Sequence, residues 1–191
     1  AACSTSATTP SSTPNAAFVA GAAVTGNSEL VSPSFAVGAD GGKVSFRNLY
    51  TLEDGFDDMV HEISINGGAY ADIITAGGKV IAGGYNDIIS SSDGSGIAGR
   101  QAWTGVSGGG ASAAYITSTI ALPASAAGQS VNLKWRVVTD ASVTPSGSGV
   151  RIDNIEVTRN ECSTLRPLDV DLTGSYRGTT DGAMLLRYLL G

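Results

Sequence analysis

The residues of this chain that could do chemistry are mainly carboxylates, and the densest group of them lies in one short stretch. Glu53, Asp54, Asp57 and Asp58 place four carboxylates within six residues. Such a group is stable when water solvates it or when a cation neutralises it, and Ca²⁺ takes six to eight oxygen ligands of this kind. We therefore expect either a calcium site with Glu53, Asp57 and Asp58 as ligands or a solvated acidic turn.

A single carboxylate further along the chain also needs a partner. Asp153 lies in the last expected strand, where alternation places it on one face with Ile155 and Val157. A carboxylate on an apolar face is costly unless it is paired. Calcium is one candidate partner, and the others are Arg47, Arg136 and Arg151.

The second acidic stretch resembles a calcium-binding loop in part. Asp169, Asp171 and Gly174 match positions one, three and six of an EF-hand loop. Thr173 stands at position five, and Asp181 lies one residue beyond position twelve, where the loop needs a bidentate acid. We expect either calcium held by Asp169, Asp171, Thr173 and Asp181 or a polar turn before a capped helix.

Catalytic residue patterns are weak in this sequence. His61 is the one histidine, so any Ser-His-Asp triad would need it, yet it falls in the middle of an expected strand. Glu53 with Asp57 or Asp58 could form a glycosidase pair, but a metal-binding loop explains these acids more simply. We therefore expect a protein that is not an enzyme, with a hydrolase as the less favoured alternative.

Two aromatic residues and two cysteines complete the candidate functional groups. Tyr85 and Trp103 lie beside glycine-rich turns, where they could stack on sugar rings, although aromatic residues of β-sandwiches are more often core residues. Cys3 and Cys162 would close a loop of about 160 residues if they formed a disulfide, as is usual in secreted proteins. The alternative is two free, buried thiols.

The elements that must position these residues are short strands. Alternation and glycine-rich turns predict strands at residues 18–24, 30–37, 43–49, 59–65, 70–75, 79–82, 100–104, 115–122, 130–139 and 150–158. Val131, Leu133, Trp135 and Val137 give the clearest alternation. The expected fold is all-β, a two-sheet antiparallel β-sandwich of the jelly-roll type with a short C-terminal α-helix.

Composition divides the chain and limits its partners. Residues 1–16 read as a Ser/Thr/Pro-rich linker, residues 17–160 as the β-sandwich, and residues 161–191 as a loop and helix. The net charge of -6 and the pI near 4.6 disfavour nucleic acid. No apolar run reaches the ~20 residues that a membrane span needs. We expect a secreted, extracellular monomer from which any signal peptide has been removed.

The sandwich segment also resembles a known family. VSFRNLYTLEDGFDDMVHEISINGGAYADI, AGGKVIAGGYN, AGRQAWTGVSGG, VNLKWRVVTD and RIDNIEV together resemble the MAM-like, immune-inhibitor-A-type jelly-roll accessory modules of secreted bacterial proteins. The resemblance implies that Glu53 and Asp57 belong to the acidic loop of that family and that Asp153 is the acid of its last strand. Asp58 stands where such loops often carry glycine.

The C-terminal residues resemble half of a dockerin-like repeat, through Asp169, Asp171, Gly174, Thr180-Asp181-Gly182 and LLRYLLG. Dockerins pair two such halves, and one is present. From the sequence we expect a calcium-stabilised, non-catalytic binding module of a secreted bacterial multidomain protein. Its partner would be an extracellular polymer or glycan, or neighbouring domains of the parent protein. The alternative is a structural or adhesive spacer without a soluble ligand.

Overall fold

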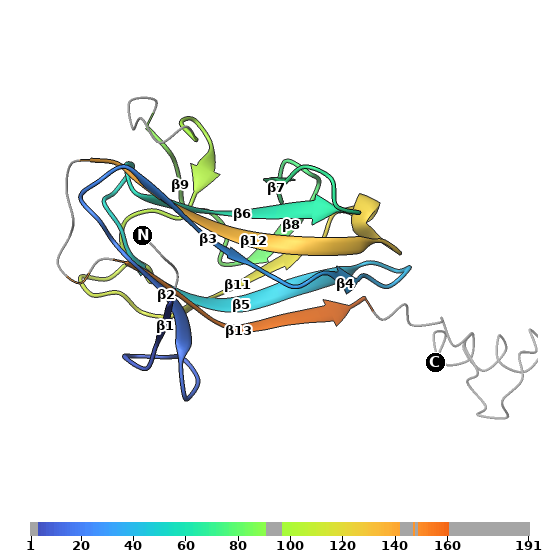
Figure 1. Ribbon diagram of the computed structural model, residues 1–191, viewed down its shortest axis with the longest axis horizontal. Coiled ribbons are helices and arrows are strands. Elements are labelled where there is room, and N and C mark those ends of the chain that lie inside the picture. The colour runs from blue at the N-terminus through green and yellow to red at the C-terminus, as the bar shows by residue number, and fades with distance from the viewer. Residues whose placement is uncertain (1–3, 91–96, 142–146, 148, 161–191) are drawn as a thin grey trace, which may run out of the picture. The chain divides into compact units, whose positions relative to one another are not determined.

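The computed structural model describes residues 4–90, 97–141, 147 and 149–160, and these residues form an all-β fold. Two antiparallel sheets face each other as a β-sandwich (Figure 1). The helical element of the described residues is the 3₁₀ turn η1 (Ala124–Ala126). The predicted fold class is confirmed, whereas the helix expected near the C-terminus falls in residues 161–191, outside the described residues.

The first sheet contains six strands. Their hydrogen-bonded order is β1 (Ser4–Ser6), β2 (Ala16–Ala20), β13 (Gly149–Arg159), β5 (Gly42–Thr51), β11 (Ile116–Ala121) and β8 (Lys79–Ala82). All of its pairings are antiparallel. A β-bulge interrupts the pairing of β13 with β5 between Asp153 and Glu156.

The second sheet is smaller and packs over the first. Its order is β3 (Gly26–Val31), β12 (Ser130–Thr139), β6 (Asp58–Ile65) and β7 (Ala71–Asp72), and β4 (Phe35–Ala36) pairs with the start of β12. A separate hairpin joins β9 (Asp87–Ile88) to β10 (Gln101–Ala102). The long strands β2, β3, β5, β6, β11, β12 and β13 alternate between the two sheets, as in a jelly roll.

The core lies between the two sheets, and strand alternation produces it as predicted. On β12 the residues Val131, Leu133, Trp135 and Val137 are all buried. On β5 every second residue from Gly42 to Tyr50 is buried. Each large apolar side chain buried in this way contributes about 1.5–3 kcal/mol. The hydrophobic pattern therefore fixes which face of each strand points inward.

The outer face of the second sheet is largely covered by other parts of the chain. Every residue of β6 from Asp58 to Ser64 is buried. Ile89, Ile97 and Ala102 pack over this face and form a second apolar cluster with Val60 and Val138. Alternation alone does not reveal a segment that folds back over the polar side of a sheet.

The N-terminal segment also differs from the expectation of a linker. Ser4–Ser6 forms β1, which pairs with β2, and the backbone N–H of Ser12 donates a hydrogen bond to Asp153 at 2.7 Å. Residues 4–16 therefore pack on the sandwich. Their Ser- and Thr-rich composition gives no apolar pattern, yet their hydroxyl and backbone groups find polar partners on the sheet.

Candidate metal and ligand sites

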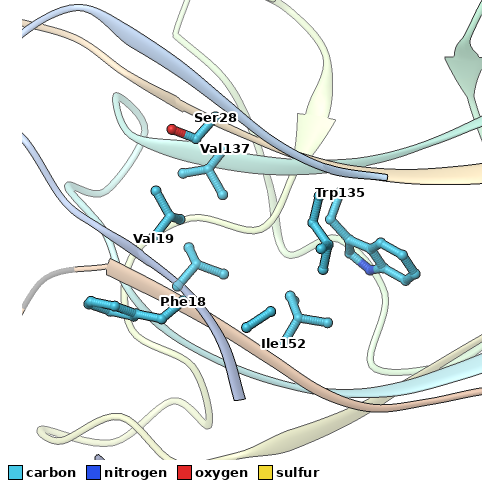
Figure 2. A pocket seen from close by; sticks show the side chains of 9 residues that line it. Phe18, Val19, Ser28, Trp135, Val137 and Ile152 are labelled. Carbon is cyan, nitrogen blue, oxygen red and sulfur yellow. The ribbon is translucent and has the colours of Figure 1, made fainter. Parts of the chain in front are cut away.

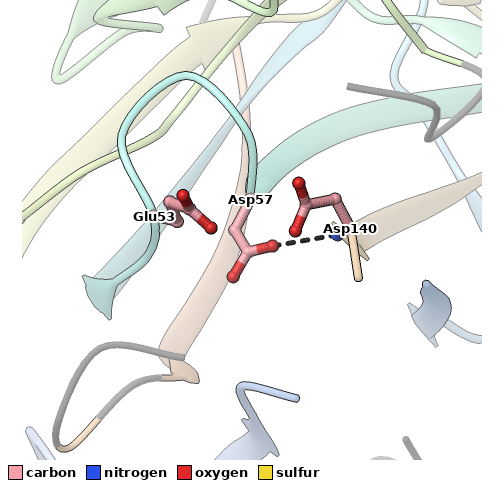
Figure 3. A group of neighbouring side chains, drawn as sticks. All are labelled: Glu53, Asp57 and Asp140. Atoms are coloured by element: carbon pink, nitrogen blue, oxygen red, sulfur yellow. Dashed lines mark hydrogen bonds between the residues drawn. The ribbon is translucent and has the colours of Figure 1, made fainter. Parts of the chain in front are cut away.

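Three acidic side chains meet at one end of the sandwich. Glu53 and Asp57 lie in the loop between β5 and β6, and Asp140 follows β12. One carboxylate oxygen of each lies within 4.8 Å of the other two (Figure 3). The register explains this meeting, because Val138 of β12 pairs with Asp58 of β6, so Asp140 emerges beside Asp57. We call Glu53, Asp57 and Asp140 the acidic triad.

The loop that carries two members of the acidic triad is fixed by a buried threonine. The Thr104 hydroxyl lies within hydrogen-bond distance of two carbonyl oxygens, that of Glu53 at 3.1 Å and that of Asp57 at 2.9 Å, and they share its one hydrogen. The backbone N–H of Gly55 donates to the same hydroxyl oxygen at 2.8 Å. Thr104 therefore holds the triad loop in one shape, and its role was not predicted from the sequence.

Asp57 is the central residue of the acidic triad. Its side chain is fully buried, with a relative exposure of 0%. Its Oδ1 accepts a hydrogen bond from the backbone N–H of Asp140 at 3.1 Å, while its buried Oδ2 accepts none of standard geometry from the described residues. An ionised carboxylate in this position lacks the partners that water would give it.

The electrostatics of Asp57 reflect this position. Burial raises the pKa of Asp57 to about 6, and the negative charges of Asp140 and Glu53 act in the same direction. The backbone N–H groups of Asp140 and Glu53 lower the pKa and offset part of the rise. A cation held between the three carboxylates would remove the cause of the shift, because it supplies positive charge where water is excluded.

The donor set of the acidic triad suits a hard cation. It presents carboxylate oxygens alone, and the open oxygen of Asp57 lies inside it. Calcium accepts such ligands in irregular geometry and completes its shell with water or carbonyl oxygens, whereas zinc prefers nitrogen and sulfur ligands. Glu53, Asp57 and Asp140 could therefore hold a hard cation such as calcium.

Asp58 does not belong to the acidic triad. It is the first residue of β6 and its side chain is fully buried. The structure groups Glu53 and Asp57 with Asp140 and not with Asp58, so Asp58 as a ligand stays a prediction from the sequence.

Asp153 does not belong to the acidic triad either. It pairs with Arg47, which precedes Glu53 by six residues, so roughly 20 Å of strand separates it from the triad. Its predicted face is also wrong, since the bulge next to it breaks the alternation that would align it with Ile155 and Val157. Asn154 within the bulge has a φ of 50°.

The partner of Asp153 is the N-terminal segment. Its Oδ2 accepts the backbone N–H of Ser12 at 2.7 Å, and its Oδ1 accepts the Ser12 hydroxyl at 3.0 Å and the backbone N–H of Asn154 at 2.7 Å. Burial raises the pKa of Asp153, but the hydrogen bonds from Ser12, Asn154 and Ser11 outweigh it and leave the pKa below its usual value. Serine thus takes the place of the metal or arginine that was predicted.

Neither predicted aromatic residue is an exposed platform for sugar. Trp103 has a relative exposure of 0%, packs edge-on against Phe46 at 5.8 Å and donates its Nε1–H to the carbonyl oxygen of Gly83 at 3.0 Å. Tyr85 packs on Trp103 at 4.6 Å and donates its hydroxyl hydrogen bond within the protein. Both glycine-rich turns fold these rings inward, so both residues belong to the core.

His61 also lies in the core. It is fully buried, stacks on Trp135 with ring centroids 4.6 Å apart, and neither ring nitrogen has a hydrogen-bond partner among the described residues. Burial lowers the pKa of His61 to about 3, although the charges of Asp72 and Glu62 oppose the shift. The imidazole is neutral at neutral pH and is shielded from any dissolved substrate.

A network of charges lies under the segment that covers the second sheet. The Glu62 carboxylate contacts Arg100 Nη1 and Lys134 Nζ, each at 2.8 Å, and Arg100 Nη2 lies 3.0 Å from Asp72. Lys134 also reaches Glu29 at 3.2 Å. Burial raises the pKa of Glu62, but the two cations outweigh burial and lower it overall. The paired charges of this network act as structural groups.

One cavity opens between the sheets beside β2 and β3 (Figure 2). Its volume is about 20 Å³, close to the space that one water molecule needs. Its lining is apolar apart from Ser28 and includes Phe18, Val19, Trp135, Val137 and Ile152. A sugar ring does not fit into it.

The remaining predicted site residues lie outside the described residues. They are Asp169, Asp171, Thr173 and Asp181 of the second acidic stretch and the cysteines Cys3 and Cys162. The second calcium site, the dockerin-like half-repeat and the disulfide therefore stay predictions. Within the described residues, the chain contains no helix with the length and apolarity that crossing a membrane requires.

No known protein family matches this sequence, and no curated protein matches it either.

Proposed function

We propose that this chain is a non-catalytic, calcium-stabilised accessory module of a secreted protein, and that the acidic triad is its calcium site. The observation that carries the proposal is the buried carboxylate of Asp57, whose Oδ2 lacks a hydrogen bond while two further carboxylates lie beside it. The threonine-fixed loop supports it, because a loop held in shape before the cation arrives loses little entropy on binding.

Calcium at the acidic triad would join elements that are far apart in the sequence. Glu53 and Asp57 lie between a strand of the first sheet and a strand of the second, and Asp140 ends β12. A shared cation would fasten this end of the sandwich. Extracellular modules hold calcium with dissociation constants of about 10⁻⁴ to 10⁻³ M, so such a site fills where calcium is abundant and empties where it is scarce.

The burial of Trp103 and Tyr85 favours the spacer role over sugar binding through these two residues. Trp103 is buried and the half-buried Tyr85 packs on it, so neither ring offers an open face to a polysaccharide. The proposal is therefore an accessory module that positions neighbouring domains or an extracellular polymer, with calcium as a structural cation and with no reaction of its own.

The experiment that tests the proposal is thermal unfolding of the intact chain in calcium and in EDTA. A site at a hundredfold excess of calcium over its dissociation constant stabilises the fold by about 2.7 kcal/mol. For a chain of this size that corresponds to a rise of roughly 5–10 °C in Tm. Asp57→Asn should abolish the rise, whereas Asp40→Asn, a change at an exposed turn, should keep it.

A second control separates the two acidic stretches. The double variant Asp169→Asn/Asp171→Asn removes the predicted C-terminal ligands and leaves the acidic triad intact. We expect it to keep the calcium-dependent rise in Tm. The absence of a rise in the unaltered chain, or a full rise in Asp57→Asn, would overturn the proposal.

A further inference from the structure

The outer face of the first sheet holds a bent segment of the chain itself, in which Thr9 has a φ of 49°. The Arg151 Nε donates a hydrogen bond to the carbonyl oxygen of Thr8 at 3.1 Å, and the Tyr115 hydroxyl donates to that of Thr9 at 2.9 Å. We call the segment of residues 8–12 the strap. We call the side chains that hold it the docking strip, which consists of Arg47, Tyr115, Arg151 and Asp153.

The strongest contact between the two is made by Asp153. Its two oxygens accept the backbone N–H and the hydroxyl of Ser12, at 2.7 and 3.0 Å. Hydrogen bonds to a charged group are about twice as strong as neutral ones. Ser12 is thus held by both oxygens of one carboxylate. One residue earlier, the Ser11 hydroxyl oxygen accepts a hydrogen bond from Arg47 Nε at 3.3 Å.

The docking strip is held in place before the strap binds. The Arg47 guanidinium lies 5.6 Å from the ring centre of Tyr115 and donates from Nη1 to the Thr117 hydroxyl at 2.8 Å. The Arg151 guanidinium lies 4.4 Å from the ring centre of Phe18. Stacking on aromatic rings orients a guanidinium, so each arginine needs little rearrangement to meet the strap.

The docking strip contacts polar groups of the strap rather than apolar side chains. It meets two backbone carbonyls, two hydroxyls and one backbone N–H of the strap. The bend at Thr9 presents these groups to the strip, and the hydroxyls restrict the fit to serine or threonine at the last two positions. The partner that fits this surface is therefore a bent Ser/Thr-rich peptide segment.

The strap also helps to keep β1 in place. β1 has three residues and pairs with β2 alone, at the edge of the first sheet. So short an edge strand has few hydrogen bonds of its own to keep it on β2. β1 precedes the strap in the chain, so the strap holds its three residues next to β2. Loss of the strap should release β1 while β2 stays paired with β13.

We propose that the docking strip is a binding surface for bent Ser/Thr-rich segments, and that residues 8–12 occupy it as a strap that fixes the path of the N-terminal part of the chain over the sandwich. An accessory module that positions its neighbours requires such a fixed path. This proposal rests on the proposed function only for the reason why a fixed path is needed, since the strap and the acidic triad share no residue.

The test is backbone NMR relaxation and amide exchange on the full chain. In the unaltered protein we expect order parameters near 0.85 for residues 8–12, as for rigid backbone, and in Ser12→Pro values below 0.6 over residues 4–12. Ser12→Pro removes both donors to Asp153 and leaves the sandwich untouched. In Asp153→Ala the Ser12 amide should exchange about tenfold faster or more, because it loses a charged acceptor.

Glu156→Ala is the matched control, since it removes an exposed carboxylate from the same strand. It should leave the order parameters and the exchange rate unchanged. Order parameters below 0.6 for residues 8–12 of the unaltered chain would overturn the proposal, as would a rigid β1 in Ser12→Pro. Neither result depends on calcium, so a failure here is distinct from a failure at the acidic triad.

Discussion

The stability of this protein should depend on pH in a way that calcium changes, because two buried groups titrate in opposite directions. His61 has a pKa lowered from 6.5 to about 3 by burial, and Asp57 has a pKa raised from 3.8 to about 6 by burial. The unfolded chain protonates the histidine below pH 6.5 while the folded chain does not. The folded chain protonates Asp57 below pH 6 while the unfolded chain does not.

The sign of each effect follows from which state binds the proton. His61 favours the folded state above pH 6.5, and this advantage is lost as pH falls toward 3. Between pH 7 and pH 5 the loss is about 2 kcal/mol, at 1.36 kcal/mol per pKa unit. Asp57 acts oppositely, since its proton is bound more tightly in the folded state. Over the same interval the protonation of Asp57 raises the free energy of unfolding by about 1 kcal/mol when no cation is bound.

Calcium should therefore steepen the pH dependence. With the acidic triad occupied, Asp57 stays ionised and the His61 loss of about 2 kcal/mol appears alone. In EDTA the net loss should be about half as large. Glu62 and Asp153 do not interfere in this window, because their pKa values are lowered and their contributions are lost only at more acidic pH.

The assay is urea unfolding at pH 7, 6 and 5, followed by the fluorescence of the two buried tryptophans, Trp103 and Trp135. Asp57→Asn in EDTA should show the full loss of the calcium-bound protein. His61→Leu keeps a side chain of similar size beside Trp135 but cannot bind a proton, so it should flatten the dependence of stability on pH in calcium. An unchanged slope in His61→Leu would refute the reasoning, because the loss would then come from another group.

Three further substitutions test the packing around the site. Glu62→Gln removes the buried carboxylate that Lys134 and the partly exposed Arg100 share, and it should cost about 3 kcal/mol in urea unfolding, whereas Glu29→Gln at the exposed end of the network should cost less than about 1 kcal/mol. Gly83→Ala would press a methyl group against a carbonyl oxygen of β11 and should cost more than Gly67→Ala, which has a similar positive φ but open space; equal losses of Tm would contradict this. Thr104→Val removes the hydroxyl that fixes the triad loop and should weaken calcium affinity about tenfold by calorimetry, a result that an unchanged affinity would exclude.

The sandwich could be predicted because its information is local. The strand periods of β5 and β12 show which residues point inward, and glycine-rich turns mark where the strands end. The predicted bounds of β8 and β12 agree with the structure. β1 and β9 were missed, since each has no apolar alternation and forms only where a partner strand is already in place.

The acidic site could be predicted only in part. Glu53 and Asp57 lie close in sequence, so a shared loop was foreseeable. Asp140 joins them through the pairing of β6 with β12, and such a register is set by packing between distant segments. Asp153 was misplaced because one bulge reverses the alternation after it, and no residue type marks that bulge in advance.

Trp103 was misjudged for a different reason. Glycine-rich turns surround it, which is typical of surface loops, yet a single bridge to Met59 of β6 turns the ring into the core. The Nε1–H of the indole finds the Gly83 carbonyl there, so the polar atom is satisfied as well. The sequence reveals the turns but not the direction in which the Trp103 side chain points between them.

Both outer faces of the sandwich are occupied by the chain itself. Ile89, Ile97 and Ala102 cover part of the second sheet beside the charge network, and the strap crosses the first. A partner would therefore meet either the loop end that carries the acidic triad or the edge strand β8, where Val80 and Ile81 are exposed. Calcium at the triad, as proposed, would stabilise the first of these two contact regions.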